Sequence, residues 1–92
     1  MNVIVSIPTA LLQYTRMTSE VHVDAATVGE VVSKLNQQFP GLKALILHEN
    51  QEVRRYVNIF VNEENIRSRD GLITKLKDGD YVHIIPSIAG GT

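Results

Sequence analysis

Two consecutive glycines, Gly90 and Gly91, lie near the C-terminal end of the sequence and are followed by Thr92. Glycine has no Cβ, so a diglycine segment can enter a narrow channel and adopt backbone angles that other residues avoid. Such a segment could present the carbonyl carbon of Gly91 to a nucleophile inside the enclosed site of another enzyme. A diglycine by itself is more typical of a frayed chain end, so the residues around it decide between the two interpretations.

Other residues that commonly do chemistry form no recognisable set. The sequence has no cysteine, which excludes disulfides, thiolate nucleophiles and cysteine ligands to metals. The three histidines, His22, His48 and His83, lack the spacing of a common metal site. No Ser/His/Asp combination, glycine-rich phosphate loop or pair of carboxylates stands out. We therefore expect no metal site, no bound cofactor and no catalysis by this chain alone.

The composition argues against nucleic acid and membrane as partners. The 92 residues include 9 Lys and Arg against 10 Asp and Glu, so the basic excess that collects phosphates is missing. No run approaches the roughly 18 apolar residues of a membrane span, and the N-terminal residues do not resemble a signal peptide. We expect a single cytoplasmic domain.

Apolar residues alternate with period two in several segments, as in half-buried strands. The clearest cover residues 2–8, 56–62 and 81–86, and residues 20–23 are suited to a hairpin with the first. Residues 11–17 are expected to form a loop, and Ile66-Arg67 a short return strand. The segment 77–80 predicts a turn with Gly79 at positive φ.

One amphipathic helix is predicted between the second and third strands. Thr27 and Glu30 have the spacing of an N-terminal capping box. Behind them runs one apolar stripe, made of Val28, Val31, Val32, Leu35 and Phe39. Pro40-Gly41 should end this helix, and a short helical turn is expected over residues 42–47.

The order of elements predicts an α+β roll with a mixed sheet of four to five strands and one main helix. A β-grasp arrangement fits, in which the last strand returns beside the first, although a ferredoxin-like order fits these short segments too. The domain is expected to cover residues 1–86. Residues 87–92 are expected to be a flexible tail that carries the diglycine.

Three stretches resemble the β-grasp, ubiquitin-like sulfur carriers, the family of the molybdopterin synthase small subunit and the thiamine-pathway carrier. They are residues 2–8, residues 56–62 and residues 78–91. The last stretch places a diglycine a few residues after Asp-Gly-Asp, a strand and Pro86, which is far more specific than a bare terminal diglycine. The opening strand and Ala89-Gly90-Gly91 most resemble the branch that serves cysteine biosynthesis in actinobacteria.

The resemblance implies a defined reaction at Gly91. In this family an E1-like activating enzyme uses ATP to adenylate the carboxylate of the terminal glycine. A sulfur donor then displaces AMP to leave a thiocarboxylate, and a sulfur-accepting synthase uses the sulfur to build a small molecule. The absence of cysteine agrees with this scheme, because the sulfur replaces a carboxylate oxygen.

Thr92 departs from the family pattern, because it holds Gly91 in a peptide bond. Some family members carry residues after the diglycine that a JAMM-type zinc metalloprotease removes. The resemblance therefore implies cleavage between Gly91 and Thr92; the alternative is that Thr92 is a sequence artefact. The ATP and the zinc would belong to the partner enzymes.

The predicted partner-binding residues are Ile4, Phe60, Ile85, Ile88 and Ala89. The first three should share the sheet face opposite the helix, where clustered apolar residues often mark a binding surface; scattered surface hydrophobes are the alternative. The pairs Arg54-Arg55 and Arg67-Arg69 could meet acidic patches on the activating enzyme, although exposed charges are usually only solvated.

Three other functions stay open at this point. The chain could be the small subunit of molybdopterin synthase, which would co-purify as a tight heteromer. It could be a ubiquitin-like modifier joined through Gly91 to lysines of other proteins, which would form conjugates of high mass. It could also be a β-grasp interaction module with an inert tail.

Overall fold

The computed structural model describes residues 1–86, which form one five-stranded sheet with two helices. The strands are β1 (Asn2–Ser6), β2 (Glu20–Asp24), β3 (Val57–Val61), β4 (Glu64–Asn65) and β5 (Tyr81–Pro86). The helices are α1 (Val28–Gln38) and α2 (Leu42–Ile46). Short 3-10 helices cover Thr9–Tyr14, Ile66–Ser68 and Gly71–Ile73. The reactive segment predicted over residues 87–92 lies outside the described residues.

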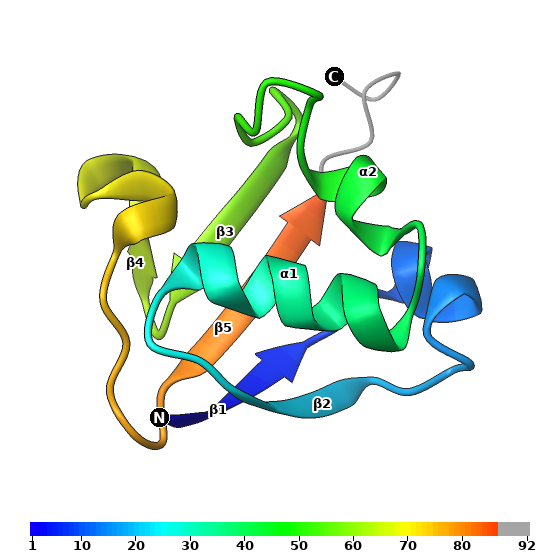
Figure 1. The fold of residues 1–92 in the computed structure, drawn as a ribbon, viewed down its shortest axis with the longest axis horizontal. Helices are drawn as coiled ribbons and strands as arrows, with labels where there is room; N and C mark the ends of the chain where they lie inside the picture. Colours follow the sequence, from blue (N-terminus) through cyan, green and yellow to red (C-terminus); the bar gives the residue numbers. More distant parts are fainter. Residues whose placement is uncertain (87–92) are drawn as a thin grey trace.

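The strand order is β2-β1-β5-β3-β4, so the last long strand lies between the first and the third. β1 and β5 are parallel, while β1 with β2, β3 with β5 and β3 with β4 are antiparallel. Helix α1 crosses one face of this mixed sheet (Figure 1). The predicted α+β β-grasp roll is confirmed, and the ferredoxin-like alternative is wrong because β5 returns beside β1 without a second βαβ unit.

The predicted capping box begins α1. The backbone N–H of Glu30 donates to the Thr27 hydroxyl (3.2 Å), and the Glu30 carboxylate accepts from the N–H of Ala26 (2.7 Å). Two N–H groups at the helix start are thereby satisfied. The helix ends at Gln38, and Gly41 then takes a φ of 98°, a left-handed conformation that glycine adopts without strain.

The apolar stripe of α1 faces the sheet and forms the core with it. The stripe residues Val28, Val31, Val32 and Leu35 are buried, whereas Phe39 lies just after the helix and is half-buried. The sheet contributes the inward-facing residues Val3, Val5, Val21, Val23, Val57, Ile59, Val61, Val82 and Ile84. The predicted inward and outward faces of β1, β3 and β5 are therefore confirmed, and α1 leaves the opposite face of the sheet uncovered.

Two expected segments differ in the structure. The expected loop over residues 11–17 contains a 3-10 helix, because Leu11 turns inward and is buried. The expected return strand at Ile66-Arg67 is wrong: β4 ends at Asn65, whose side-chain oxygen accepts from the N–H of Arg67 (2.9 Å) and starts a helical turn. This turn buries the side chain of Ile66 in the core.

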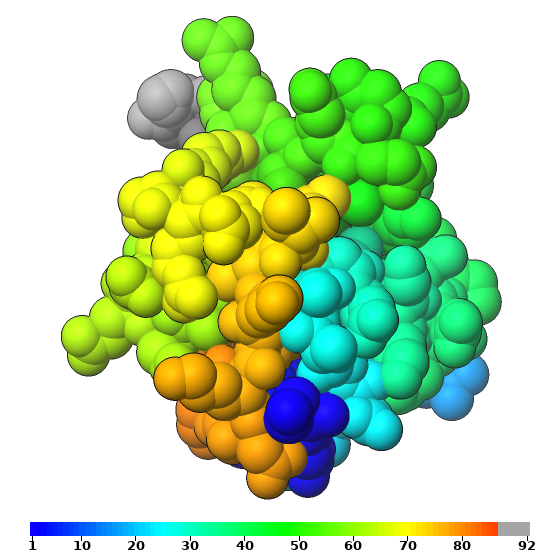
Figure 2. All heavy atoms as spheres, turned by 60° about the vertical axis from the view of Figure 1, so that its left-hand side comes forward, coloured from blue at the N-terminus to red at the C-terminus, as the bar shows by residue number. Residues whose placement is uncertain are grey.

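The turn before β5 ties the end of the chain to its beginning. Gly79 has a φ of 89°, as predicted for this turn. The Asp78 carboxylate accepts from the N–H of Asn2 (2.7 Å), which fixes the turn against the start of β1. Figure 2 shows the N-terminal residues packed between this orange segment and the cyan region around the start of α1. The turn therefore sets β5 beside β1.

Candidate functional site

The point where the predicted tail begins is fixed by the sheet. Pro86 ends β5 and lies opposite Val57 in the register with β3. Earlier in the strand, residues 81–83 also pair with β1. The predicted reactive and cleavage residues Gly90, Gly91 and Thr92, and the predicted contact residues Ile88 and Ala89, lie outside the described residues. The strand that precedes these residues, β5, is thus fixed by its pairing with β1 and β3.

The other predicted contact residues lie on the sheet face that α1 leaves uncovered. Ile4 and Phe60 are half-buried, and Ile85 is 48% exposed. Their neighbours along each strand are buried, so the alternation directs all three side chains away from the core. The structure brings them onto the adjacent strands β1, β3 and β5.

Two aromatic residues of β5 complete this surface, and the sequence reading did not select them. Tyr81 pairs with Ile4 across the sheet, and His83 pairs with Phe60. The rings of Tyr81 and His83 stack with centroids 5.6 Å apart and planes 10° from parallel. The alternation of β5 already placed both residues opposite the core. We call Ile4, Phe60, Tyr81, His83 and Ile85 the open-face patch.

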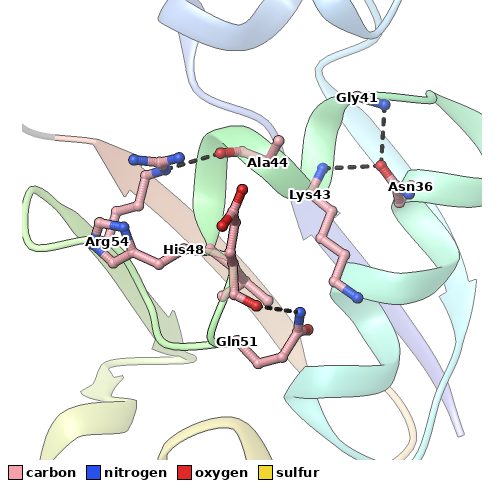
Figure 3. Close-up of a pocket in the computed structure, with 9 residues that line it drawn as sticks. Asn36, Gly41, Lys43, Ala44, His48, Gln51 and Arg54 are labelled. Atoms are coloured by element: carbon pink, nitrogen blue, oxygen red, sulfur yellow. Dashed lines mark hydrogen bonds between the residues drawn. The ribbon is translucent and has the colours of Figure 1, made fainter.

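The hollow between α1, α2 and residues 48–54 shows no reactive set (Figure 3). The Asn36 side-chain oxygen accepts from the backbone N–H groups of Gly41 and Lys43, both at 3.1 Å, and so joins the two helices. Gln51 donates to the carbonyl of Glu49 (3.2 Å). These side chains shape the local backbone. In the part of the chain that the structure describes, no group of His, Asp and Glu is placed to hold a metal ion.

The N-terminal end of the sheet carries a structural ion pair. The terminal ammonium of Met1 donates a hydrogen bond to the Asp24 carboxylate (2.8 Å) and thereby holds the pKa of that carboxyl below its usual range. Asp24 pairs with Asn2 at the start of β1, whereas Pro86 ends the parallel strand β5. The pair is therefore remote from the point where the tail begins.

No helix within residues 1–86 has the length and apolar character needed to cross a bilayer.

Comparison with known proteins assigns the chain to a family. The sequence pattern of the ThiS family matches residues 5–91, which includes the diglycine and stops before Thr92. The chain belongs to the ThiS family. The resemblance to β-grasp sulfur carriers that was inferred from residues 2–8, 56–62 and 78–91 is thereby confirmed.

Several relatives of this ThiS-family chain are carriers or modifiers by name. The sulfur carrier protein CysO of Mycobacterium tuberculosis is 40% identical over 93 residues, which cover 99% of this chain and 100% of CysO. The small archaeal modifier protein 3 of Haloferax volcanii is 40% identical over 68 residues, 74% of this chain and 73% of that protein.

A solved structure supports the same placement within the ThiS family. The Amycolatopsis orientalis BexX/CysO complex contains a chain with 38% identity and a TM-score of 0.90, which covers 97% of this chain and 99% of its own length. Similarity over nearly the whole length of CysO agrees with the prediction of a small carrier rather than a catalyst.

Proposed function

We propose that this chain is a sulfur carrier that bears a thiocarboxylate on Gly91. The main support is the family match over residues 5–91, because this match includes the diglycine. The 40% identity to CysO over its full length points to the same function. The absence of cysteine adds a chemical reason, because the chain has no side-chain thiol on which sulfur could be held. The β-grasp domain would present Gly91 to enzymes that perform the chemistry.

The proposed loading has two balanced steps. The free carboxylate of Gly91 attacks the α-phosphate of ATP, which forms an acyl-adenylate and releases pyrophosphate. Hydrosulfide, or an equivalent sulfur donor, then attacks the acyl carbon; the C–O bond to AMP breaks, AMP leaves and a proton is lost, so Gly91 ends as a thiocarboxylate. The activating enzyme supplies the electrostatic stabilisation, and this chain supplies a carbonyl without a neighbouring side chain.

The proposed sulfur sink is the synthesis of a small molecule, either cysteine or a specialised metabolite. Its support is the similarity to CysO, whose solved complex in Amycolatopsis orientalis contains BexX. A sulfur-accepting synthase would take the sulfur from Gly91 after loading. Before loading, a JAMM-type metalloprotease would remove Thr92.

The test is the intact mass of the protein isolated from its native cells. We expect a form that ends at Gly91 and is heavier than the carboxylate by the difference between one sulfur and one oxygen atom. Since the chain has no cysteine, a thiol-alkylating reagent should add one label to this form and none to a Gly91→Val variant. Protein that carries neither sulfur nor label in sulfur-replete cells would count against the proposal.

The open-face patch is proposed as the docking surface for the activating enzyme, together with Ile88 and Ala89 of the tail. Phe60→Asp places a charge within the patch, beside His83 of β5, and aromatic residues are frequent hot spots of interfaces. We expect the Kd for the activating enzyme to rise at least tenfold, which corresponds to about 1.4 kcal/mol. The midpoint of urea denaturation should change little.

The matched control is Ser33→Asp, which adds the same charge at an exposed position of α1, on the other side of the sheet from the patch. This variant should leave the Kd nearly unchanged. Equal weakening by both substitutions would show that overall charge acts rather than the patch. A large loss of stability in Phe60→Asp would mean that Phe60 serves mainly the packing of the sheet.

A second candidate function is that of a ubiquitin-like modifier, favoured by the 40% identity to small archaeal modifier protein 3. In that case the activated carbonyl of Gly91 would be transferred to lysine amines of other proteins. An antibody against this chain would then detect conjugates of high mass that disappear in the Gly91→Val variant. A molybdopterin synthase subunit would instead co-purify in a stable heteromer.

A further inference from the structure

Two segments that carry arginines meet beside the point where β5 ends. Arg54 and Arg55 precede β3, and Arg67 belongs to the 3-10 turn after β4. The Arg67 guanidinium donates to the carbonyl of Arg54 (3.1 Å) and to the side-chain oxygen of Asn58. We call Arg54, Arg55 and Arg67 the arginine cluster. The tertiary structure thus assembles a basic site from residues 12–13 positions apart.

The two outer arginines are held by local contacts. The Nε atom of Arg54 donates to the carbonyl of Ala44 in α2 (2.8 Å; Figure 3). The Arg55 guanidinium lies 5.9 Å from the centre of the Tyr56 ring, a distance suited to a cation–π contact. Because these contacts restrict the side chains beforehand, a ligand has less conformational entropy to overcome when it binds them.

The cluster borders a hollow of about 490 Å³ with apolar walls. Arg54 and Arg55 line it together with His48. The apolar lining comes from α2, from the entry to β3 and from the end of β5, and it consists of Leu45, Tyr56, Val57 and Pro86. Arginine and tyrosine beside apolar surface are typical of the central residues of protein interfaces. Since Pro86 is the last residue of β5, the hollow adjoins the start of the tail.

The charges of the cluster have no acidic partner within residues 1–86. No carboxylate there forms an ion pair with Arg54, Arg55 or Arg67, whereas Arg69 pairs with Glu64 (3.1 Å). Guanidinium groups bind carboxylates through two parallel hydrogen bonds. The Arg67 guanidinium donates to the Asn58 side chain and to the Arg54 carbonyl, so Arg67 acts as a positioning residue for the backbone of Arg54. The outer pair, Arg54 and Arg55, is the part that can receive a carboxylate.

We propose that the arginine cluster docks an acidic segment of the activating enzyme. The inference rests on the proposed function, in which that enzyme encloses the residues after Pro86. The enzyme surface around the entrance of its tail channel must then lie against the hollow. Aspartate or glutamate side chains at this entrance bind Arg54 and Arg55, and apolar groups beside them enter the hollow.

The experiment measures the Kd between the activating enzyme of the source organism and a version of this chain ending at Gly91, at several salt concentrations. Arg54→Gln with Arg55→Gln should raise the Kd about tenfold at low salt, because charge-assisted contacts are lost. The wild-type Kd should rise with salt much more steeply than that of the double variant. The Kd of the double variant Arg54→Lys with Arg55→Lys should lie between those of wild type and the glutamine double variant. Lysine keeps the positive charge but lacks the planar guanidinium that binds a carboxylate through two hydrogen bonds.

The matched control is Lys75→Gln with Lys77→Gln, which removes the same charge. Both lysines are exposed and precede the start of β5, at the end opposite Pro86. This variant should change the Kd less than about twofold, as expected for exposed charges outside a contact. The single variant Arg55→Gln loses the contact with the Tyr56 ring and breaks no side-chain hydrogen bond within residues 1–86, so it guards against a general loss of folding.

Two of the possible outcomes distinguish failure of the docking site from failure of the proposed function. Equal weakening by the arginine and lysine double variants overturns the docking proposal while sulfur loading continues. Arginine-dependent binding of a chain that is never adenylated overturns the proposed function and leaves the docking site standing. No measurable binding of the wild type overturns both. If removal of residues 87–91 shifts the side-chain NMR signals of Arg54 and Arg55 as much as the enzyme does, the tail itself occupies the cluster and the proposal is wrong.

Discussion

Full-length protein incubated with activating enzyme, ATP and sulfide is expected to gain no sulfur, whereas a version ending at Gly91 gains one atom. Adenylation requires a free carboxylate, and in the full-length chain the Gly91 carbonyl belongs to the amide bond with Thr92. The Thr92 carboxylate is a poor substitute, because its β-branched side chain restricts χ1 and crowds the carbonyl in a channel suited to glycine. Intact mass spectrometry distinguishes the two forms.

A metalloprotease would restore the reaction by cutting between Gly91 and Thr92. Its zinc-bound water would attack the Gly91 carbonyl carbon, and the amine of Thr92 would leave with a proton. Incubation with this protease should therefore convert inert full-length protein into a form that loads sulfur. The family match that stops at Gly91 supports this prediction.

The matched control for this experiment is full-length protein with Thr92→Gly. Should this variant gain sulfur on its terminal residue while wild type does not, the side chain of Thr92, and not the mere presence of a residue after Gly91, is the barrier to loading. Sulfur gain by wild-type protein that keeps its threonine would end the trimming hypothesis. If neither the full-length nor the trimmed form reacts, the sulfur-carrier proposal loses most of its support.

Leu35→Ala is expected to lower the free energy of unfolding by about 2–5 kcal/mol, a large share of the stability of a small domain. Leu35 is fully buried on the face of α1 that packs against the sheet. Truncation removes apolar burial and leaves a cavity, because the surrounding side chains relax only in part. Urea denaturation followed by circular dichroism measures the change.

Gln37→Ala is the control for this substitution, since Gln37 lies on the exposed side of the same helix. Its effect should stay within about 0.5 kcal/mol, and alanine even has a slightly higher helix propensity than glutamine. A loss below about 0.5 kcal/mol for Leu35→Ala would contradict the packing of Leu35. The slope of unfolding free energy against urea should be the same for wild type and both variants if unfolding remains two-state.

The sequence by itself determined the elements whose signals are local. Thr27 and Glu30 predicted the start of α1 because the capping hydrogen bonds join residues only three or four apart. The inward faces of β1, β3 and β5 followed from period two, since successive side chains of a strand point to opposite sides. The return strand predicted at Ile66-Arg67 was wrong, because a short apolar signal does not distinguish a strand from a buried helical turn.

Only the tertiary structure decided which distant residues become neighbours. The register of β5 between β1 and β3 sets Tyr81 beside Ile4 and His83 beside Phe60, and so forms the open-face patch. The turn after β4 brings Arg67 to the carbonyl of Arg54 and separates it from Arg69. Such contacts depend on strand pairing and chain path over long separations. Strand pairing is set by the total free energy of the sheet and the core. A local pattern of residue types does not contain this total, because it depends on contacts between distant segments.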